Sequence, residues 1–355
     1  MARHDGPMGD AMAEPGSGGE PQDPRLGRVL REAAAPGLLA ALAERLTPTD
    51  LQTLLLAVFR RRAAAVTAGR LLQQYESSRF TSPSPLEPLD LARLDVLVHE
   101  RLAEHGFTGV ELSPVAPLGT NSAIATVDQN KVVTTVRNTE VVADPTNVLA
   151  LECAVRRRRL LRADARSRRR VRLGATHRVI RAQAFPGPGM AAHFKLSALC
   201  TAGRDEGSFG FETETLTEQI HLHLDVLERS RRIVRRNRGK PTVRVTVTDL
   251  TGHRHAELST RVLAPLSQAY PDTVFALDPE RLTGRGYYTG ACFEIRAATP
   301  DGEDLNIADG GFTTWTADLL SNAKERLLIS GLGVERLCDR FPQGPHPPAG
   351  GAQPA

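Results

Sequence analysis

The sequence predicts an α+β fold in which an antiparallel sheet is flanked by helices and preceded by a small helical module. Short alternating apolar segments at residues 273–276, 291–295 and 327–331 are separated by glycines, as expected of half-buried antiparallel strands. Leucines at three- and four-residue steps across residues 26–75 indicate amphipathic helices instead. We expect Gly310-Gly311 to form a turn before the last strand and a helix to begin near Val334.

Composition describes an ordinary globular protein. The chain has 355 residues, of which 41% are hydrophobic and 24% charged, enough for one large domain with appendages. No apolar run approaches the roughly 20 residues of a membrane span, and the N-terminus lacks the hydrophobic segment of a secretory signal. The four cysteines are far apart, so we expect reduced thiols, a cytoplasmic location and no metal site.

Composition and hydrophobic periodicity divide the chain into five segments. Residues 1–25 and 341–355 are rich in Gly, Pro and small polar residues, so both are expected to be disordered tails. Residues 26–80 form the helical module, of two or three helices, and residues 81–89 a Pro-rich linker. Residues 90–340 form the core.

A capping signal and two arginine blocks stand out along the chain. Thr49 or Asp50 is the expected cap of the helix that carries Leu51, Leu54 and Val58. Residues 156–172 contain two runs of arginine, which indicate either a nucleic-acid or phosphate-binding surface or a solvated helix and loop.

The first part of the core reads as a helix followed by several short strands. A helix over residues 90–105 ends at Gly106, and a strand over 108–112 ends at a proline, which suits a sheet edge or a dimer seam. Residues 124–127 and 131–136 are predicted to be short strands. Asp144 and Pro145 then begin a helix over 148–159.

A hairpin in the middle of the core carries the residues expected to bind a nucleotide. Its strands cover residues 171–185 and 193–201, joined by Pro186-Gly187-Pro188-Gly189. Arg181 on one strand could neutralise phosphate oxygens, and Phe194 on the other could stack on a base. A long helix over residues 212–236 follows, and then a strand over 243–248.

These segments resemble the catalytic core of class II aminoacyl-tRNA synthetases, and histidyl-tRNA synthetase in particular, over about residues 90–340. Residues 284–295, GRGYYTGACFEI, are similar to its histidine-binding motif. Residues 332–337, LGVERL, are similar to class motif 3, residues 105–114 to motif 1, and residues 178–194 to motif 2.

The resemblance implies an antiparallel sheet of about six strands, a homodimer, and adenylate formation from ATP with Mg²⁺. It implies catalytic roles for Arg181 at the α-phosphate and Arg336 at the triphosphate tail, with Gln183 and Phe194 also contacting the nucleotide. The substrate side would be formed by Thr146, Asn147, Arg285, Tyr287, Tyr288, Gly310 and Gly311.

Several positions depart from the family pattern. Gln183 stands where motif 2 has a glutamate, and Leu196 where it has a glutamine that binds the substrate amine. Thr283 and Gly286 replace the arginine and aspartate of the histidine-binding motif, and we expect Arg285 to compensate for the lost arginine. Histidine is therefore not the expected substrate. The chain ends at Ala355, with no room for an anticodon-binding domain, so charging of tRNA is not expected either.

Three functions remain open from the sequence. The first is a stand-alone ligase that activates a small amino or carboxylic acid and passes it to a carrier protein, a peptide or a small molecule. The second is a non-catalytic paralogue that resembles the regulatory subunit of ATP phosphoribosyltransferase and binds an enzyme partner. The third is an interaction scaffold built on the helical module and the arginine blocks.

Overall fold

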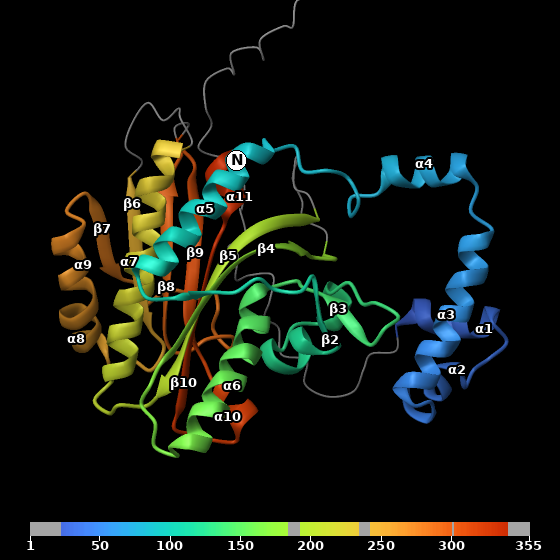
Figure 1. The fold of residues 1–355 in the computed structure, drawn as a ribbon, viewed down its shortest axis with the longest axis horizontal. Helices are drawn as coiled ribbons and strands as arrows, with labels where there is room; N and C mark the ends of the chain where they lie inside the picture. The colour runs from blue at the N-terminus through green and yellow to red at the C-terminus, as the bar shows by residue number, and fades with distance from the viewer. Residues whose placement is uncertain (1–22, 184–191, 234–241, 300–301, 340–355) are drawn as a thin grey trace, which may run out of the picture.

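A computed structural model describes residues 23–183, 192–233, 242–299 and 302–339. The expected loop 186–189, the tail 341–355 and most of the tail 1–25 lie outside these ranges. The described core is built on one eight-stranded sheet with the order β1-β4-β5-β10-β9-β8-β6-β7 (Figure 1). Within the described ranges, no helix combines the length and apolar character that a membrane span requires.

The six central strands are antiparallel throughout, as the family resemblance implies. In sheet order they are β4 (Val171–Ile180), β5 (His193–Arg204), β10 (Glu325–Leu332), β9 (Asp304–Thr313), β8 (Thr289–Ala298) and β6 (Val243–Asp249). Two short edge strands add to them, and both pair in parallel: β1 (Thr108–Gly109) with β4, and β7 (Thr273–Leu277) with β6. The strand expected at residues 108–112 is therefore shorter than predicted, and it lies at an edge.

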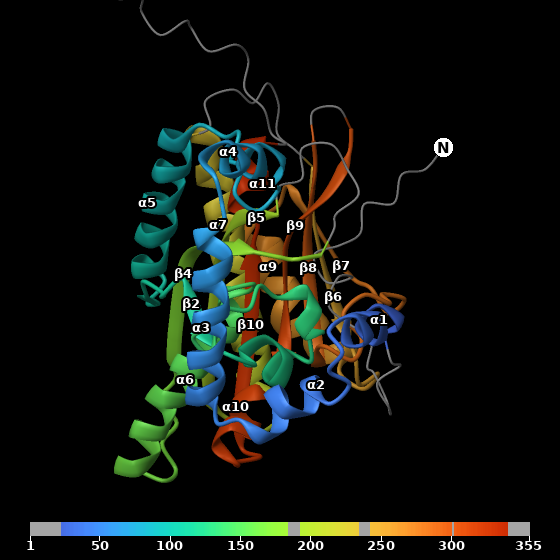
Figure 2. The same cartoon turned by 90° about the vertical axis from the view of Figure 1, so that its right-hand side faces the viewer.

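Helices cover both faces of this sheet. On one face lie α5 (Pro88–Glu104), α7 (Gly210–Ile233), α8 (His255–Leu258) and α9 (Ala264–Ala269), with a π-helical turn at Ser259–Leu263. On the other lie α6 (Pro145–Ala163) and α10 (Trp315–Leu320) (Figure 2). The strands alternate accordingly: in β10, Leu328 faces the first layer while Leu327 and Ile329 face the second.

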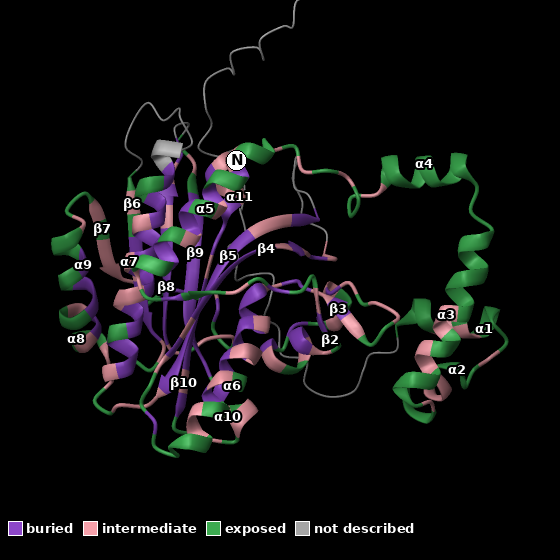
Figure 3. Cartoon of the chain, viewed as in Figure 1, coloured by how far each residue is buried: buried purple, intermediate pink, exposed green. Residues whose placement is uncertain are grey.

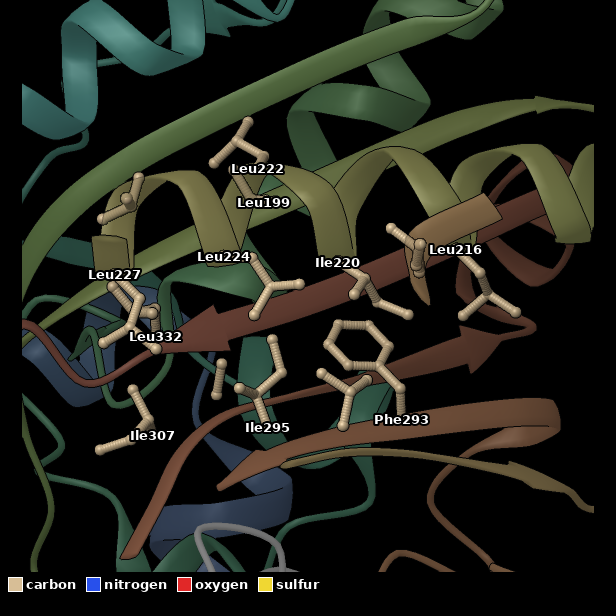
Figure 4. Close-up of a cluster of buried hydrophobic side chains, with 14 of the residues drawn as sticks. Leu199, Leu216, Ile220, Leu222, Leu224, Leu227, Phe293, Ile295, Ile307 and Leu332 are labelled. Carbon is tan, nitrogen blue, oxygen red and sulfur yellow. The ribbon is translucent and has the colours of Figure 1, made fainter. Parts of the chain in front are cut away.

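The larger core lies between α7 and the sheet. Leu216, Ile220 and Leu224 recur at four-residue steps along α7 and point toward the strands (Figure 4). They meet Phe293 and Ile295 on β8, and these five side chains are at most 3% exposed. An apolar stripe of this spacing is what fixes a helix on a sheet face.

A small two-stranded sheet, β2 (Val115–Pro117) with β3 (Thr139–Val141), replaces the strands expected at 124–127 and 131–136. No strand forms at residues 124–127, and residues 131–136 pair with β3 only through an isolated bridge between Thr134 and Glu140. The segment instead folds around a buried carboxylate. Glu140 accepts bonds from the backbone N–H groups of Gly119 at 2.9 Å and Asn121 at 2.8 Å, and from the Gln129 side chain at 3.0 Å. The chain folds around Glu140 as a π-helical turn, Thr120–Ile124, and a 3₁₀ turn, Gln129–Lys131.

Gly310 and Gly311 lie inside β9 and do not form the expected turn. A Cβ atom on Gly310 would lie 2.5 Å from the Ser330 Cβ and 2.6 Å from the Phe293 ring, and one on Gly311 would lie 2.6 Å from the Tyr288 ring. Glycine is required here because the neighbouring chains approach too closely for any side chain.

The N-terminal helices lie away from the core (Figures 1 and 3). They are α1 (Pro24–Glu32), α2 (Leu38–Ala40), α3 (Pro48–Ala64) and α4 (Ala68–Ser77), with a π-helical turn at Ala41–Arg45. We call residues 24–80 the arm. None of its residues is buried, and the first buried residue of the described chain is Leu91. The cap of α3 is Thr47 rather than Thr49 or Asp50: its hydroxyl accepts a bond from the Asp50 N–H at 3.2 Å.

Candidate functional site

A cavity of about 40 Å³ opens between the central strands and the start of α6. It lies beside the hairpin β4–β5, so the sheet holds its walls in fixed register. The residues that line it are Asp144, Thr146, Arg181, Leu196, Ser197, Ala198, Tyr287, Tyr288, Asp309, Ile329, Ser330 and Gly331.

One wall is formed by the end of the hairpin and the start of α6. The Arg181 guanidinium donates to the Ala143 carbonyl oxygen at 3.1 Å and lies 3.5 Å from Asp144 Oδ2. It also lies over the Phe194 ring, 5.2 Å from the ring centroid, in a cation–π arrangement. Asp144 caps α6 by accepting a bond from the Thr146 N–H at 2.9 Å. A charged group and an aromatic face are thus presented side by side.

The opposite wall is a buried acid held by a tyrosine and an arginine. Asp309 accepts hydrogen bonds from the Tyr288 hydroxyl and from Arg281 Nη2. Burial raises the pKa of the Asp309 carboxyl, and the positive charge of Arg281 only partly offsets that effect. Burial likewise raises the pKa of the Tyr287 and Tyr288 hydroxyls, so both stay protonated donors at neutral pH.

Arg281 stands directly behind Asp309. Its Nε donates to the Thr283 carbonyl oxygen at 3.0 Å, and its side chain is 3% exposed. Burial opposes the charged form, but Asp309, Cys292 and Glu294 together raise the pKa of Arg281. Its Nη1 is buried and has no hydrogen-bond partner among the described residues. A guanidinium therefore lies beside Thr283, which stands where the family motif has its arginine.

Four of the residues proposed from sequence line this cavity: Thr146, Arg181, Tyr287 and Tyr288. Phe194 lies against Arg181. Gly310 and Gly311 lie in β9 behind the wall, where they allow Tyr288 and Phe293 to pack closely.

The other proposed residues lie outside the cavity lining. Asn147 is fully buried and donates to Asn121 Oδ1 at 2.6 Å. Arg285 is exposed, and its guanidinium donates to the carbonyl oxygens of Arg281 at 2.7 Å and Pro279 at 3.1 Å. Arg336, on α11 (Val334–Asp339), donates to the Asn306 carbonyl oxygen at 2.5 Å.

Sequence reasoning missed the acidic wall. Asp309 and Arg281 are 28 positions apart, and the signal that could have identified them is modest: an acid immediately before Gly310 and an arginine two residues before Thr283. Ser330 was also missed. Its hydroxyl donates to Gln219 Oε1 at 2.7 Å and lies 2.7 Å from Nε2 of the buried His223, so a polar network supports the cavity floor.

Gln183 is held by the arm. The Arg79 guanidinium donates to the Gln183 carbonyl oxygen at 2.9 Å and also to that of Ala182. Three residues later, the Ser82 carbonyl oxygen lies 2.6 Å from His193 Nε2. The segment after α4 is thereby bonded to the residues that follow β4 and to the start of β5, on either side of the hairpin loop.

Four of the ten arginines at residues 156–172 form ion pairs within the described chain. Arg157 is fully buried against Glu325, and Arg170 binds Glu206 and Glu214. The last arginine of the second block, at position 172, pairs with Glu218 at 2.8 Å. These contacts give Arg157, Arg170 and Arg172 structural roles. The exposed arginines of the range are Arg158, Arg159, Arg162, Arg166, Arg168 and Arg169.

The donor set fits the nucleotide end of an adenylating site better than it fits a bound metal. Arg181 and Phe194 offer a cation and an aromatic face at one place. No three His, Cys, Asp or Glu side chains of the described chain are grouped as a resident metal would need. A Mg²⁺ ion would therefore be held chiefly by the phosphates that it accompanies.

Comparison with known proteins finds solved structures of similar fold. No family model matches the sequence, and no curated protein matches it. Apo histidyl-tRNA synthetase of S. aureus is similar in structure, with a TM-score of 0.52 and 12% identity over 72% of this chain and 67% of that one. The RNA-binding domain of threonyl-tRNA synthetase from Cryptosporidium parvum gives 0.51 and 11% over 71% of this chain and 63% of that one.

An ATP phosphoribosyltransferase regulatory subunit/histidyl-tRNA synthetase from Bacillus halodurans gives a TM-score of 0.48 and 14% identity over 74% of this chain and 83% of that one. The six antiparallel strands with helices on both faces are a class II synthetase-like core. The resemblance to histidyl-tRNA synthetase expected from the motifs is confirmed at the level of the fold.

Proposed function

We propose that this chain is an ATP-dependent ligase that activates a small amino or carboxylic acid as its adenylate. The observation that carries the proposal is the pairing of Arg181 with Phe194 beside a cavity that Asp309 and Tyr288 also line, with Arg281 bound to Asp309. An arginine on an aromatic face suits the α-phosphate and adenine, and the cavity beyond it suits a small acid.

The reaction requires positioning more than covalent help. A carboxylate oxygen of the acid attacks the α-phosphorus of ATP, and the bond from that phosphorus to the bridging oxygen breaks, so pyrophosphate leaves with the electron pair. Arg181 would neutralise charge that develops on the α-phosphate oxygens. Mg²⁺ supplies further neutralisation of the triphosphate when it is bound.

The cavity limits the acid to a small one. A volume of about 40 Å³ leaves no room for a bulky side chain unless Tyr287 and Tyr288 move. Thr283 and Leu196 occupy positions where the family has an arginine and a glutamine that contact the substrate histidine. Their replacement also favours another substrate. We further propose a cytoplasmic homodimer that uses the β1 edge and hands its product to a carrier protein or enzyme partner; the four free cysteines are consistent with that compartment.

Pyrophosphate exchange tests the proposal. Purified protein with ATP, Mg²⁺ and labelled pyrophosphate should form labelled ATP only when the correct small acid is added. Arg181→Ala should abolish the signal, whereas Arg285→Ala, which removes an exposed guanidinium, should retain it. Absence of exchange across a panel of amino and carboxylic acids would count against a ligase.

A regulatory paralogue is the second candidate, because a cation behind the cavity and one on the adjoining strand β4 already have protein partners. Arg178 pairs with Glu335 at 2.6 Å, and Arg281 pairs with Asp309. Because these positive charges are already neutralised by protein carboxylates, the site would bind an effector without accelerating phosphoryl transfer. Calorimetry separates the two candidates: a small acid or ATP that binds with no exchange would favour the regulator.

A further inference from the structure

The arm exposes most of the large apolar side chains that the described chain shows to solvent. Twelve of the eighteen exposed large hydrophobic residues lie between Leu26 and Phe80. On α3, Leu54 and Val58 are each 43% exposed and Phe59 is 54% exposed. Apolar side chains gathered in this way on a surface usually mark a contact with another molecule.

Helix α3 also gains little stability from its own chain. It has 17 residues, and none of them is buried. Isolated helices of about this length are marginal in water, since most helix stability in proteins comes from packing of an apolar face. An arm with this composition therefore requires a partner surface.

The charges of α3 indicate which partner fits. Asp50 lies in the first turn of α3 and Arg62 in its last turn. Asp50, Leu54, Val58 and Arg62 follow one another at four-residue steps, so they form one continuous stripe along the helix. The stripe begins with an acid, has an apolar middle and ends with a base. It is complementary to a copy of itself that runs in the opposite direction.

We propose that α3 pairs antiparallel with α3 of a second copy of this chain. A two-fold axis near Leu56 places Leu54 opposite Val58 of the second copy. The same register places Asp50 opposite Arg62 of the second copy, so a single arrangement satisfies the apolar contacts and both ion pairs. Such an isologous contact is the usual form of a homodimer.

This contact is separate from the ligase proposal and from the β1 edge. It uses no residue of the cavity, and it would hold whether the chain activates an acid or only binds one. It also places the second copy on the arm that Arg79 fastens to the hairpin of Arg181.

Site-specific crosslinking of the full-length protein tests the register. In the proposed dimer, the two copies of Ala57 are offset by only about 3 Å along the helices. A bifunctional maleimide that spans the 8–10 Å typical of packed helix axes should therefore join two Ala57→Cys chains. Ala65→Cys follows the last residue of α3, and its copies would be about 27 Å apart along the helices, so it should remain uncrosslinked. The wild-type chain, with three buried cysteines and a half-buried Cys338, controls for native thiols.

Exchange of the charges at positions 50 and 62 then tests whether the two α3 helices are electrostatically complementary. In the Ala57→Cys background, Asp50→Arg or Arg62→Asp alone brings like charges together and should lose the covalent dimer. The double variant Asp50→Arg/Arg62→Asp should restore it. Circular dichroism of each variant checks that the helices persist.

Three results would overturn the proposal. Ala57→Cys chains that stay monomeric would indicate that α3 packs on its own core or on a different protein. Equal crosslinking at positions 57 and 65 would indicate parallel or unspecific contact. Crosslinking that ignores the charge exchange would exclude the Asp50–Arg62 register.

Discussion

Arg157 and Glu325 form an ion pair from which solvent is fully excluded. Arg157 Nε lies 2.7 Å from Glu325 Oε2, and Arg157 Nη2 lies 2.8 Å from Oε1. The same guanidinium donates to the Ser167 carbonyl oxygen at 3.0 Å. The pair joins α6 to β10 and turns one member of a basic run into an internal structural contact.

Removal of one partner should destabilise the fold strongly. Arg157→Met leaves Glu325 charged and buried, and we expect the free energy of unfolding to fall by about 3–5 kcal/mol. Urea denaturation measures this loss. Arg159→Met, at an exposed position of the same helix, is the matched control and should change stability little. If the double variant Arg157→Met/Glu325→Leu is no more stable than Arg157→Met, the unpaired charge is not the cause.

Arg281 should matter more to function than Arg285. Arg281→Ala leaves Asp309 buried beside Tyr288 without its cation, and losses of about 2–5 kcal/mol are typical when one partner of a buried charge pair is truncated. We expect the rate of pyrophosphate exchange at low acid concentration to fall at least about 30-fold, which corresponds to 2 kcal/mol. Arg285→Ala should stay near wild type, and unfolding curves for both variants separate loss of function from loss of fold.

Gly310 should not tolerate a methyl group. Its Cβ would meet the Ser330 Cβ, the Phe293 ring and the Ile329 carbonyl oxygen, all within 2.7 Å. We expect Gly310→Ala to lower the free energy of unfolding by about 1–3 kcal/mol, as overpacking does. Gly331 on the paired strand is the control, because the nearest atom to its Cβ would be 3.8 Å away. Equal effects of the two substitutions in thermal unfolding would contradict the steric explanation.

His223 should make stability depend on pH. Burial lowers its pKa to about 3, so the folded state leaves it neutral where the unfolded state binds a proton. Between pH 6.5 and 3 the unfolded state therefore holds more protons, and stability falls as the pH falls, by up to about 1.4 kcal/mol per unit.

His223→Gln keeps a donor toward Ser330 and removes this titration. The difference in unfolding free energy between wild type and variant should shrink steadily from pH 6 to pH 4. Parallel curves over that range would show that His223 does not titrate as its burial implies.

The sequence predicts those parts of the molecule whose partners follow a regular pattern. The strands β4, β5, β6, β8 and β10 and the helix α7 were predictable, because apolar patterning marks the buried face of each, as with Leu216, Ile220 and Leu224. Strand β9 was not, since Gly310-Gly311 was expected to form a turn. Residues 119–131 were not predictable either, because the backbone N–H groups of Gly119 and Asn121 bond to the Glu140 carboxylate, 19 to 21 residues away. A local pattern does not encode such a partner.

In the candidate site, too, some residues were predictable from the sequence and others were not. Arg181, Phe194, Tyr287 and Tyr288 belong to recognisable motifs, and the fold brings them together. The pair of Arg281 and Asp309 forms only when β8 and β9 bring the loop before β8 beside the middle of β9, which no spacing in the sequence specifies.

The contacts that Arg79 makes with Ala182 and Gln183 couple two otherwise separate parts of the chain. If a partner on the arm changes the affinity of the hairpin for a ligand, the ligand must change the affinity of the arm for that partner by the same factor. Arm and pocket are then reciprocal effectors of one another. The coupling can be measured by determining the affinity for the ligand at several concentrations of the partner, or the reverse.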